Sequence, residues 1–340
     1  MIRPPTQEDV AQLAGVSRST VSIVLNERTD RQIRISEETR RKVWEAAEQL
    51  GYEPNALARS LRIGQSHNIG VLVPNLSNMH YLEILDGIEH VLTSSGYYVT
   101  LVVTNFDPER ERGCFSSLFQ QRLDGLILMP TFWGEMPDEM TTLAELGRPA
   151  VFLTPGADAH DRVVSDITGG ARHLMDHLLG LGHTRIGFIN GVAREGLTAE
   201  RQAVYREKLA TAGIAFDARL FINCGPEMED GYRATLGLLT GDDPPTAIWT
   251  INDLLAVGAR RAIYDLGLRI PQDVALAGCD GTALAAQLAP PLTTIEIPAR
   301  EIGERAARVV LDHIENPGPE PVLHVFETRL IVRSSTDPSV

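Results

Sequence analysis

The chain has 340 residues, of which 43% are hydrophobic, and its net charge at neutral pH is −14. This length suits a small domain followed by a larger one, and the apolar content is sufficient for sizeable cores. No apolar run approaches the roughly 18 residues of a membrane-spanning helix, and the first residues lack the apolar stretch of a secretory signal. We therefore expect a cytoplasmic protein with no membrane partner.

Two short helices separated by a glycine are predicted near the N-terminus. Gly15 interrupts a helical pattern where a tight turn needs a residue that tolerates positive φ, and Ser17 is of the type that caps a helix. Helix, turn and helix in this order are typical of DNA-binding motifs, although an ordinary helical hairpin would show the same pattern. The inward faces of the two helices are predicted to consist of Val10, Leu13 and Ala14, and of Val21, Val24 and Leu25.

A third helix is predicted from Ser36, another capping residue, to Leu50, just before Gly51. Pro54 then suits the first position of a further helix, but residues 55–61 would form barely two turns. So short a helix is marginal alone in water, and we expect it to order only against a partner or a nucleic acid.

The acidic charge lies away from this N-terminal region. Residues 1–66 contain ten Lys or Arg and nine Asp or Glu, a net charge near +1, and the remainder of the chain carries about −15. Contact with DNA phosphates must therefore come from local groups and not from the field of the whole protein. The candidates for such contacts are Arg18, Arg28, Arg31, Arg34, Arg59 and Arg62.

Strands and helices alternate after residue 66. Continuous apolar strands of this kind are typical of parallel sheets that are covered by helices on both faces. The pattern runs twice, so it predicts two α/β lobes with a ligand cleft at the carboxyl ends of their strands. The predicted strands cover residues 69–74, 98–104, 125–129, 150–153, 185–190, 218–223, 247–251, 274–278 and 323–332, with helices between them and at 296–316.

Residues 9–61 resemble the DNA-binding headpiece and hinge of the lactose-repressor/galactose-repressor (LacI/GalR) family of bacterial transcription regulators. The matching segments are Asp9–Ser22, Val24–Asn26, Ser36–Arg40 and Gly51–Leu61, and the rest of the chain is similar too. The resemblance implies a small all-α helix-turn-helix headpiece followed by an α/β two-lobed domain like that of periplasmic binding proteins, with parallel sheets. The implied boundaries are 1–54 for the headpiece, 55–66 for the hinge helix and linker, and 67–340 for the effector-binding and dimerisation domain, with lobe 1 at about 67–163 and 297–323 and lobe 2 at about 164–296 and 324–340.

The resemblance also implies which residues meet DNA. Arg18 and Ser19 are expected to face base edges, and Leu61 is expected to wedge into the minor groove at the operator centre. Many relatives carry arginine where this chain has Ile23, which either meets a thymine methyl group or packs inside the headpiece. Thr20 and Ser22 are expected nearer phosphates. The complete expected set is Thr6, Gln7, Ser17, Arg18, Ser19, Thr20, Ser22, Ile23, Asn26, Asn55, Ala58, Arg59 and Leu61.

An effector site between the lobes is implied in the same way. Arg201 matches an arginine that clamps hydroxyls or carboxylates, and Asp280 matches a carboxylate that accepts from hydroxyl or amine groups; a structural salt bridge or a capping role is the alternative for both. Pro226 stands where many relatives carry an aromatic residue, which weakens the prediction of a simple sugar, and Trp133 is a candidate replacement, whereas Trp249 lies mid-strand and is expected in the core. The complete expected set is Tyr81, His80, Trp133, Asp166, Arg201, Asn252, Asp253 and Asp280.

The sequence contains no motif of a known enzyme class that fits its context. Residues 180–187 superficially resemble a nucleotide-binding loop, but they follow a helix and precede a strand, the wrong order for a phosphate at a helix N-terminus. Three cysteines and nine histidines show no metal-ligand spacing, so we expect no metal and no cofactor.

We therefore expect a regulator and not an enzyme: a repressor that binds double-stranded operator DNA as a homodimer and responds to a small polar metabolite, such as a sugar, a sugar derivative or a nucleoside-like compound. A dimer is expected because the chain stops at Val340 without the heptad-bearing helix of tetrameric relatives. The alternative is a solute-binding or sugar-processing protein with the same two-lobed fold.

Overall fold

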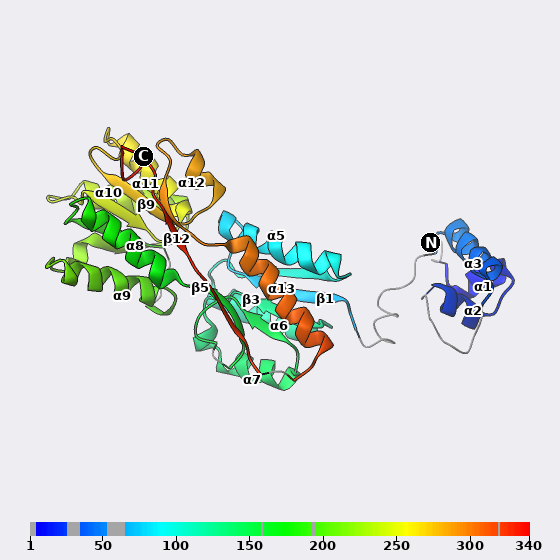
Figure 1. Ribbon diagram of the computed structural model, residues 1–340. Coiled ribbons are helices and arrows are strands. Elements are labelled where there is room, and N and C mark those ends of the chain that lie inside the picture. Colours follow the sequence, from blue (N-terminus) through cyan, green and yellow to red (C-terminus); the bar gives the residue numbers. More distant parts are fainter. Residues whose placement is uncertain (1–4, 26–34, 53–64, 158, 192–194, 319) are drawn as a thin grey trace. The chain divides into compact units, whose positions relative to one another are not determined.

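The computed structural model describes residues 5–25, 35–52, 65–157, 159–191, 195–318 and 320–340. Five of the expected DNA-binding residues, Asn26, Asn55, Ala58, Arg59 and Leu61, lie outside the described residues. The chain forms two compact units, Met1–Ser66 and His67–Val340 (Figure 1). Among the described residues, no helix has the length and apolar character needed to cross a membrane.

The first unit contains three helices: α1 (Gln7–Ala14), α2 (Arg18–Leu25) and α3 (Glu37–Leu50). The predicted turns and caps are confirmed, since Gly15 and Gly51 end α1 and α3 with φ of 67° and 60°, and Ser36 accepts from the backbone of α3. The three helices share one apolar core. One inward residue was wrongly predicted: Leu13 is 47% exposed, and its neighbour Ala11 is buried in its place.

The second unit contains two six-stranded sheets. Sheet 1 has the order β11-β5-β4-β3-β1-β2 and is parallel throughout, and sheet 2 has the order β12-β10-β9-β8-β6-β7 and is parallel except for the pairing of β12 with β10. The strands are β1 (Asn68–Val73), β2 (Tyr98–Val103), β3 (Gly125–Leu128), β4 (Ala150–Phe152), β5 (Asp161–Ser165), β6 (Ile186–Asn190), β7 (Phe221–Asn223), β8 (Ala247–Thr250), β9 (Ala275–Asp280), β10 (Thr293–Glu296), β11 (Leu323–Phe326) and β12 (Arg329–Ile331).

Helices cover both faces of each sheet, as the continuous apolar strands predicted. In sheet 1, Val71 and Leu72 are both fully buried, but they point to opposite faces and join different apolar clusters. In sheet 2, Phe188 and Ile189 are divided in the same way. The helices are α5 (Met79–Ser94), α6 (Pro108–Gln120), α7 (Pro137–Leu146), α8 (Ile167–Gly180), α9 (Glu195–Thr211), α10 (Met228–Leu239), α11 (Asp253–Asp265), α12 (Ala283–Gln287) and α13 (Ala299–Glu315), with two 3-10 turns, η1 (Trp133–Glu135) and η2 (Ala218–Leu220).

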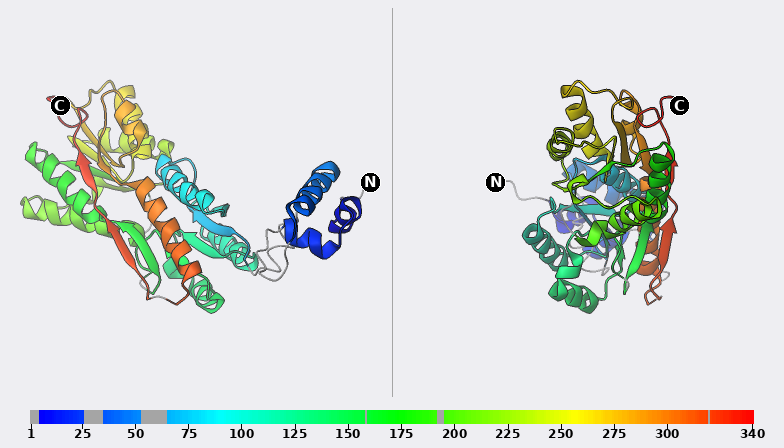
Figure 2. Two further views of the ribbon diagram at one scale, coloured as in Figure 1. Left: turned by 45° about the vertical axis from the view of Figure 1, so that its right-hand side comes forward. Right: turned by 90° about the vertical axis from the view of Figure 1, so that its left-hand side faces the viewer.

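The chain crosses between the sheets three times, after β5, after β10 and after β11. The last crossing corrects one prediction, because residues 323–332 form two strands and not one, with β11 in sheet 1 and β12 in sheet 2. This segment, coloured red, runs along both lobes in both views of Figure 2. From here on, lobe 1 means sheet 1 with α5, α6, α7 and α13, and lobe 2 means sheet 2 with α8 to α12. Sheet 1 therefore extends to Ser165 and Phe326, a few residues beyond the boundaries expected at 163 and 323.

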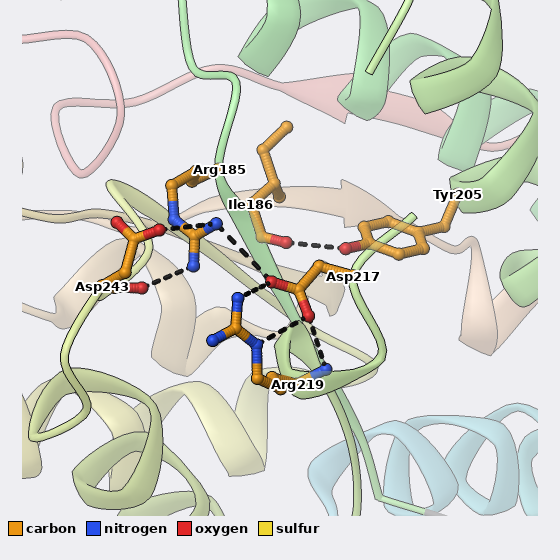
Figure 3. A network of polar contacts seen from close by, with 6 residues as sticks. All are labelled: Arg185, Ile186, Tyr205, Asp217, Arg219 and Asp243. Carbon is orange, nitrogen blue, oxygen red and sulfur yellow. Dashed lines mark hydrogen bonds and ion pairs between the residues drawn. The ribbon is translucent and has the colours of Figure 1, made fainter. Parts of the chain in front are cut away.

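A polar network stabilises the edge of sheet 2 at which the strands begin (Figure 3). Arg185, just before β6, forms ion pairs with Asp243 at 3.0 Å and with Asp217 at 3.6 Å, and Asp217 also pairs with Arg219 at 2.7 Å. The hydroxyl of Tyr205 donates to the carbonyl of Ile186 at 2.7 Å. These contacts hold the loops at the amino ends of the strands, which leaves the opposite edge of the sheet for a ligand.

Candidate effector cavity and DNA-binding surface

A cavity of about 230 Å³ lies between the two lobes, where the strands of both sheets end. Its walls come from the segments after β1, β3, β4 and β5 of lobe 1, and from α9 and the segments after β8 and β9 of lobe 2. This is the edge that strand polarity predicted for a ligand. Five expected effector-binding residues line it: His80, Tyr81, Arg201, Asn252 and Asp280.

Asp280 is the last residue of β9 and is only 5% exposed. Its φ of 107° is rare for a residue with a side chain, and backbone strain of this kind is typical of functional sites. One carboxylate oxygen, Oδ2, accepts a hydrogen bond from the amide of Asn78 at 2.9 Å. Burial raises the pKa of the Asp280 carboxyl, whereas the Asn78 amide and the charge of Arg201 favour its ionised form. The cavity therefore has a buried acceptor in lobe 2 that is directed by a donor from lobe 1.

Arg201 and His80 contribute two further polar side chains to the cavity. Among the described residues, the Arg201 Nε and the His80 Nδ1 are buried and make no hydrogen bond within the protein. Burial lowers the pKa of His80 to about 4 against the opposing charge of Glu83, with a smaller lowering contribution from Arg201, so the imidazole is neutral at physiological pH. The neutral ring can donate from one nitrogen and accept at the other.

Aromatic rings complete the wall beside these groups. The Tyr81 ring lies 5.4 Å from that of His80 and 6.5 Å from that of Phe106, measured between centroids. Burial raises the pKa of Tyr81, so its hydroxyl stays protonated. Phe106 lines the cavity but was not predicted, although its place just after β2 is a signal that could have found it.

Three expected effector-binding residues, Trp133, Asp166 and Asp253, are not among the residues that line the cavity. Trp133 is 5% exposed and packs in the lobe 1 core, with ring centroids 5.3 Å from Phe115 and 4.8 Å from Phe152. Asp166 caps α8 by accepting from the Gly169 backbone at 2.9 Å.

Asp253 is buried behind Asp280 and supports the turn that follows β9. Its carboxylate accepts from the Thr282 backbone at 2.8 Å, from the Thr282 hydroxyl at 3.0 Å and from the Thr294 hydroxyl at 2.6 Å. Burial raises its pKa, and the charge of Asp280 raises it further. Its neighbour Asn252 has two roles, because it lines the cavity and also caps α11 through the Leu255 backbone at 2.8 Å. Trp249 is fully buried against Phe188, so its predicted place in the core is confirmed.

Glu111 was not predicted, yet it positions part of the cavity wall. Its side chain is completely buried in lobe 1 and accepts from the backbone of Thr131 at 2.9 Å and of Phe132 at 2.7 Å. Thr131 lines the cavity, so this carboxylate holds the loop after β3 in place. Among the described residues, no group of three or more His, Cys, Asp or Glu side chains is placed to hold a metal ion.

The N-terminal end of α2 presents polar side chains to solvent. The Ser17 hydroxyl caps the helix by accepting from the Thr20 backbone at 3.1 Å, and it also bonds to the Thr20 hydroxyl at 2.8 Å. Arg18 and Ser19 are exposed, and Ser22 and Ile23 are half-buried, one helical turn further on the same face. Ile23 is absent from the buried cluster of the headpiece, in contrast to Val21, Val24 and Leu25.

Comparison with known proteins agrees with this organisation. Residues 6–55 match the family described as bacterial regulatory proteins, lacI family, and residues 175–336 match the periplasmic binding protein-like domain. The chain is 35% identical to the HTH-type transcriptional repressor PurR of Klebsiella pneumoniae (strain 342) over 337 residues, which cover 97% of this chain and 96% of that protein.

Two solved structures are similar over nearly the whole chain. The lac repressor dimer bound to operator and the anti-inducer ONPF has a TM-score of 0.83 and 28% identity, with 98% of this chain and 99% of that chain covered. The complex of the transcriptional regulator CelR with cellobiose has a TM-score of 0.72 and 30% identity, with 97% and 99% covered. The chain belongs to the LacI family of bacterial regulatory proteins, which are DNA-binding transcriptional repressors that respond to small-molecule effectors.

Proposed function

We propose that this protein represses transcription in the cytoplasm by binding a pseudo-palindromic operator as a homodimer, and that a small polar metabolite in the cavity between its lobes changes its affinity for DNA. The observation that carries the proposal is the cavity itself, which is lined by Arg201 of α9 and by Asp280, which has a positive φ at the carboxyl end of β9. The exposed N-terminus of α2 supplies the DNA-binding half of the proposal.

The polar groups of the cavity define the chemistry of the effector. Arg201 only donates and ionised Asp280 only accepts, so the ligand needs both oxygen or nitrogen acceptors and hydroxyl or amine donors. The cavity of about 230 Å³ is below the range of roughly 300–1,000 Å³ that drug-sized ligands occupy. We therefore propose a compact effector, a sugar, a sugar derivative or a nucleoside-like compound, whose apolar face lies against Tyr81 or Phe106.

The proposal is tested by a thermal-shift screen of metabolites followed by an operator mobility-shift assay with each hit. We expect a hit to change the amount of bound operator while its own concentration stays constant. Consumption of the metabolite, or a hit that has no effect on DNA binding, would favour a sugar-processing or solute-binding protein of the same fold.

The protein is expected to be a dimer in solution, like the lac repressor dimer to which it is similar. Two copies related by a two-fold axis place two headpieces on the two halves of a pseudo-palindrome. Multi-angle light scattering at micromolar concentration should give twice the chain mass of 37.2 kDa. A stable tetramer, or a monomer that binds the operator with full affinity, would contradict this expectation.

The operator is expected to differ from the usual half-site of the family at the base pair that faces Ile23. An isoleucine side chain cannot donate a hydrogen bond to guanine, but it can contact the methyl group of thymine. Selection of binding sites from random DNA should therefore recover thymine at this position, and the Ile23→Arg variant should recover guanine. Recovery of guanine with the wild-type chain would show that Ile23 does not read this base pair. We propose the remaining DNA contacts, from Thr6 to Leu61, on the family resemblance.

A further inference from the structure

Two asparagines in the loop after β1 use their side chains in the same way. The Asn75 Oδ1 accepts from the backbone of Asn78 at 3.3 Å, and its Nδ2 donates to Oε1 of Glu227 at 3.2 Å. The Asn78 Oδ1 accepts from the backbone of His80 at 3.0 Å, and its Nδ2 donates to Oδ2 of Asp280 at 2.9 Å. Both asparagines are buried, with 5% and 6% of their surface exposed.

Two of these four bonds connect the lobes, and in both of them the donor belongs to lobe 1. An amide side chain has an acceptor end and a donor end. In both asparagines the acceptor end is bound to the backbone of lobe 1, so the donor end is directed at lobe 2. Each partner there is a carboxylate, and a hydrogen bond to an ionised acceptor is stronger than one between neutral groups. Glu227 immediately precedes α10 and Asp280 ends β9, both in lobe 2, so both bonds form only when the lobes are close together.

We infer that Asn75 and Asn78 form an interlobe latch, in which two amides of lobe 1 hold two carboxylates of lobe 2 and stabilise the closed position of the lobes. The bond from Asn78 engages Oδ2 of Asp280, a cavity residue, so Asn78 is also a positioning residue for this carboxylate. The role in regulation rests on the proposed function of the cavity. The latch itself does not, because Asn75 and Glu227 are not among the residues that line the cavity.

The test uses the full-length protein and hydrogen–deuterium exchange monitored by mass spectrometry. The Asn75→Asp variant keeps the size of the side chain and its local acceptor, but it places a carboxylate against Glu227. Loss of a hydrogen bond to a charged group shifts an equilibrium by about tenfold or more. We therefore expect exchange to become about tenfold faster in residues 129–131 of lobe 1 and 251–252 of lobe 2, which line the cavity and are distant in sequence from both Asn75 and Glu227.

A second substitution separates the latch from a local disturbance. In the double variant Asn75→Asp with Glu227→Gln, the pair is reversed, because the new amide can donate to the new carboxylate. We expect the double variant to return to within about threefold of the wild-type exchange rate, and Glu227→Gln alone to stay near wild type because its carbonyl still accepts. The Asn78→Asp variant, which retains a good helix cap for α5, should open the cavity in the same way.

Faster exchange that is confined to residues 75–80 and 227–230 would overturn the inference, and so would a double variant that exchanges as fast as Asn75→Asp. This experiment requires no effector. The inference about the latch can therefore be contradicted even if an effector is found, and it can be supported even if no metabolite binds the cavity.

Discussion

Replacing Arg201 or Asp280 with alanine is expected to abolish the response to the effector. The Arg201 Nε is buried without a partner in the described part of the chain, and Asp280 is held in a rare backbone conformation at the end of β9. A ligand acceptor would supply the contact that the Arg201 Nε lacks, and the Asp280 carboxylate would accept from a hydroxyl or amine of the same ligand. Removal of one partner of a charged hydrogen bond costs roughly 1.5–3 kcal/mol, so the effector affinity should fall about ten- to a hundredfold in each variant.

The measurement is calorimetric titration of the effector identified by the screen, with operator affinity determined in parallel. Arg206→Ala is the matched control, because Arg206 lies on the same helix, α9, but its guanidinium lies over the ring of Phe216, outside the cavity. If the effector is an inducer, operator binding should survive in all three variants, since the headpiece is a separate compact unit. If the effector is a co-repressor, effector-dependent repression should disappear in the two cavity variants. Wild-type effector affinity in both cavity variants would show that the clamp lies elsewhere.

The Gly303→Ala variant is expected to destabilise lobe 1 severely. Helices α5 and α13 pack so closely that a Cβ on Gly303 would lie 2.1 Å from the carbonyl oxygen of Ile84, and a Cβ on Gly87 would lie 2.1 Å from that of Arg300. The opposing atoms belong to the backbone, so no side chain can rotate to make room. Overpacking of a core costs about 1–3 kcal/mol or more, and we expect the upper end here, which lowers Tm by at least about 6 °C.

The consequence extends to the cavity, because α5 begins at Met79 and carries His80 and Tyr81 in its first turn. Thermal unfolding followed by circular dichroism provides the measurement. Gly113→Ala is the control. Gly113 is exposed on α6, and a Cβ there would meet nothing within 4 Å apart from its neighbours and its own helix backbone, so the alanine should stabilise that helix by about 0.5–1 kcal/mol. Equal Tm values for the two variants would show that the close approach of α5 and α13 is not required.

Local patterns were sufficient for most helices and strands. Gly15, Ser17 and Ser36 end or begin helices as predicted, because a cap or a positive φ depends on neighbours within about four residues. Continuous apolar runs likewise predicted the buried strands of both sheets. Three short elements, β5, β10 and α12, were not predicted, since four or five residues without a repeating pattern give no period to detect.

Contacts between distant segments could not be predicted by such rules. Nothing within residues 323–332 shows that β11 and β12 belong to different sheets, because their partners, β5 and β10, are far away in the chain. Trp133 follows β3, as a cavity residue would, but its ring fills a gap in the lobe 1 core. Arg201 and Asp280 stand out by family resemblance, whereas the bond from Asn78 to Asp280 joins residues 202 positions apart. Such a pair depends on strand order and on the closure of two lobes, and these are properties of packing that no local pattern of residues encodes.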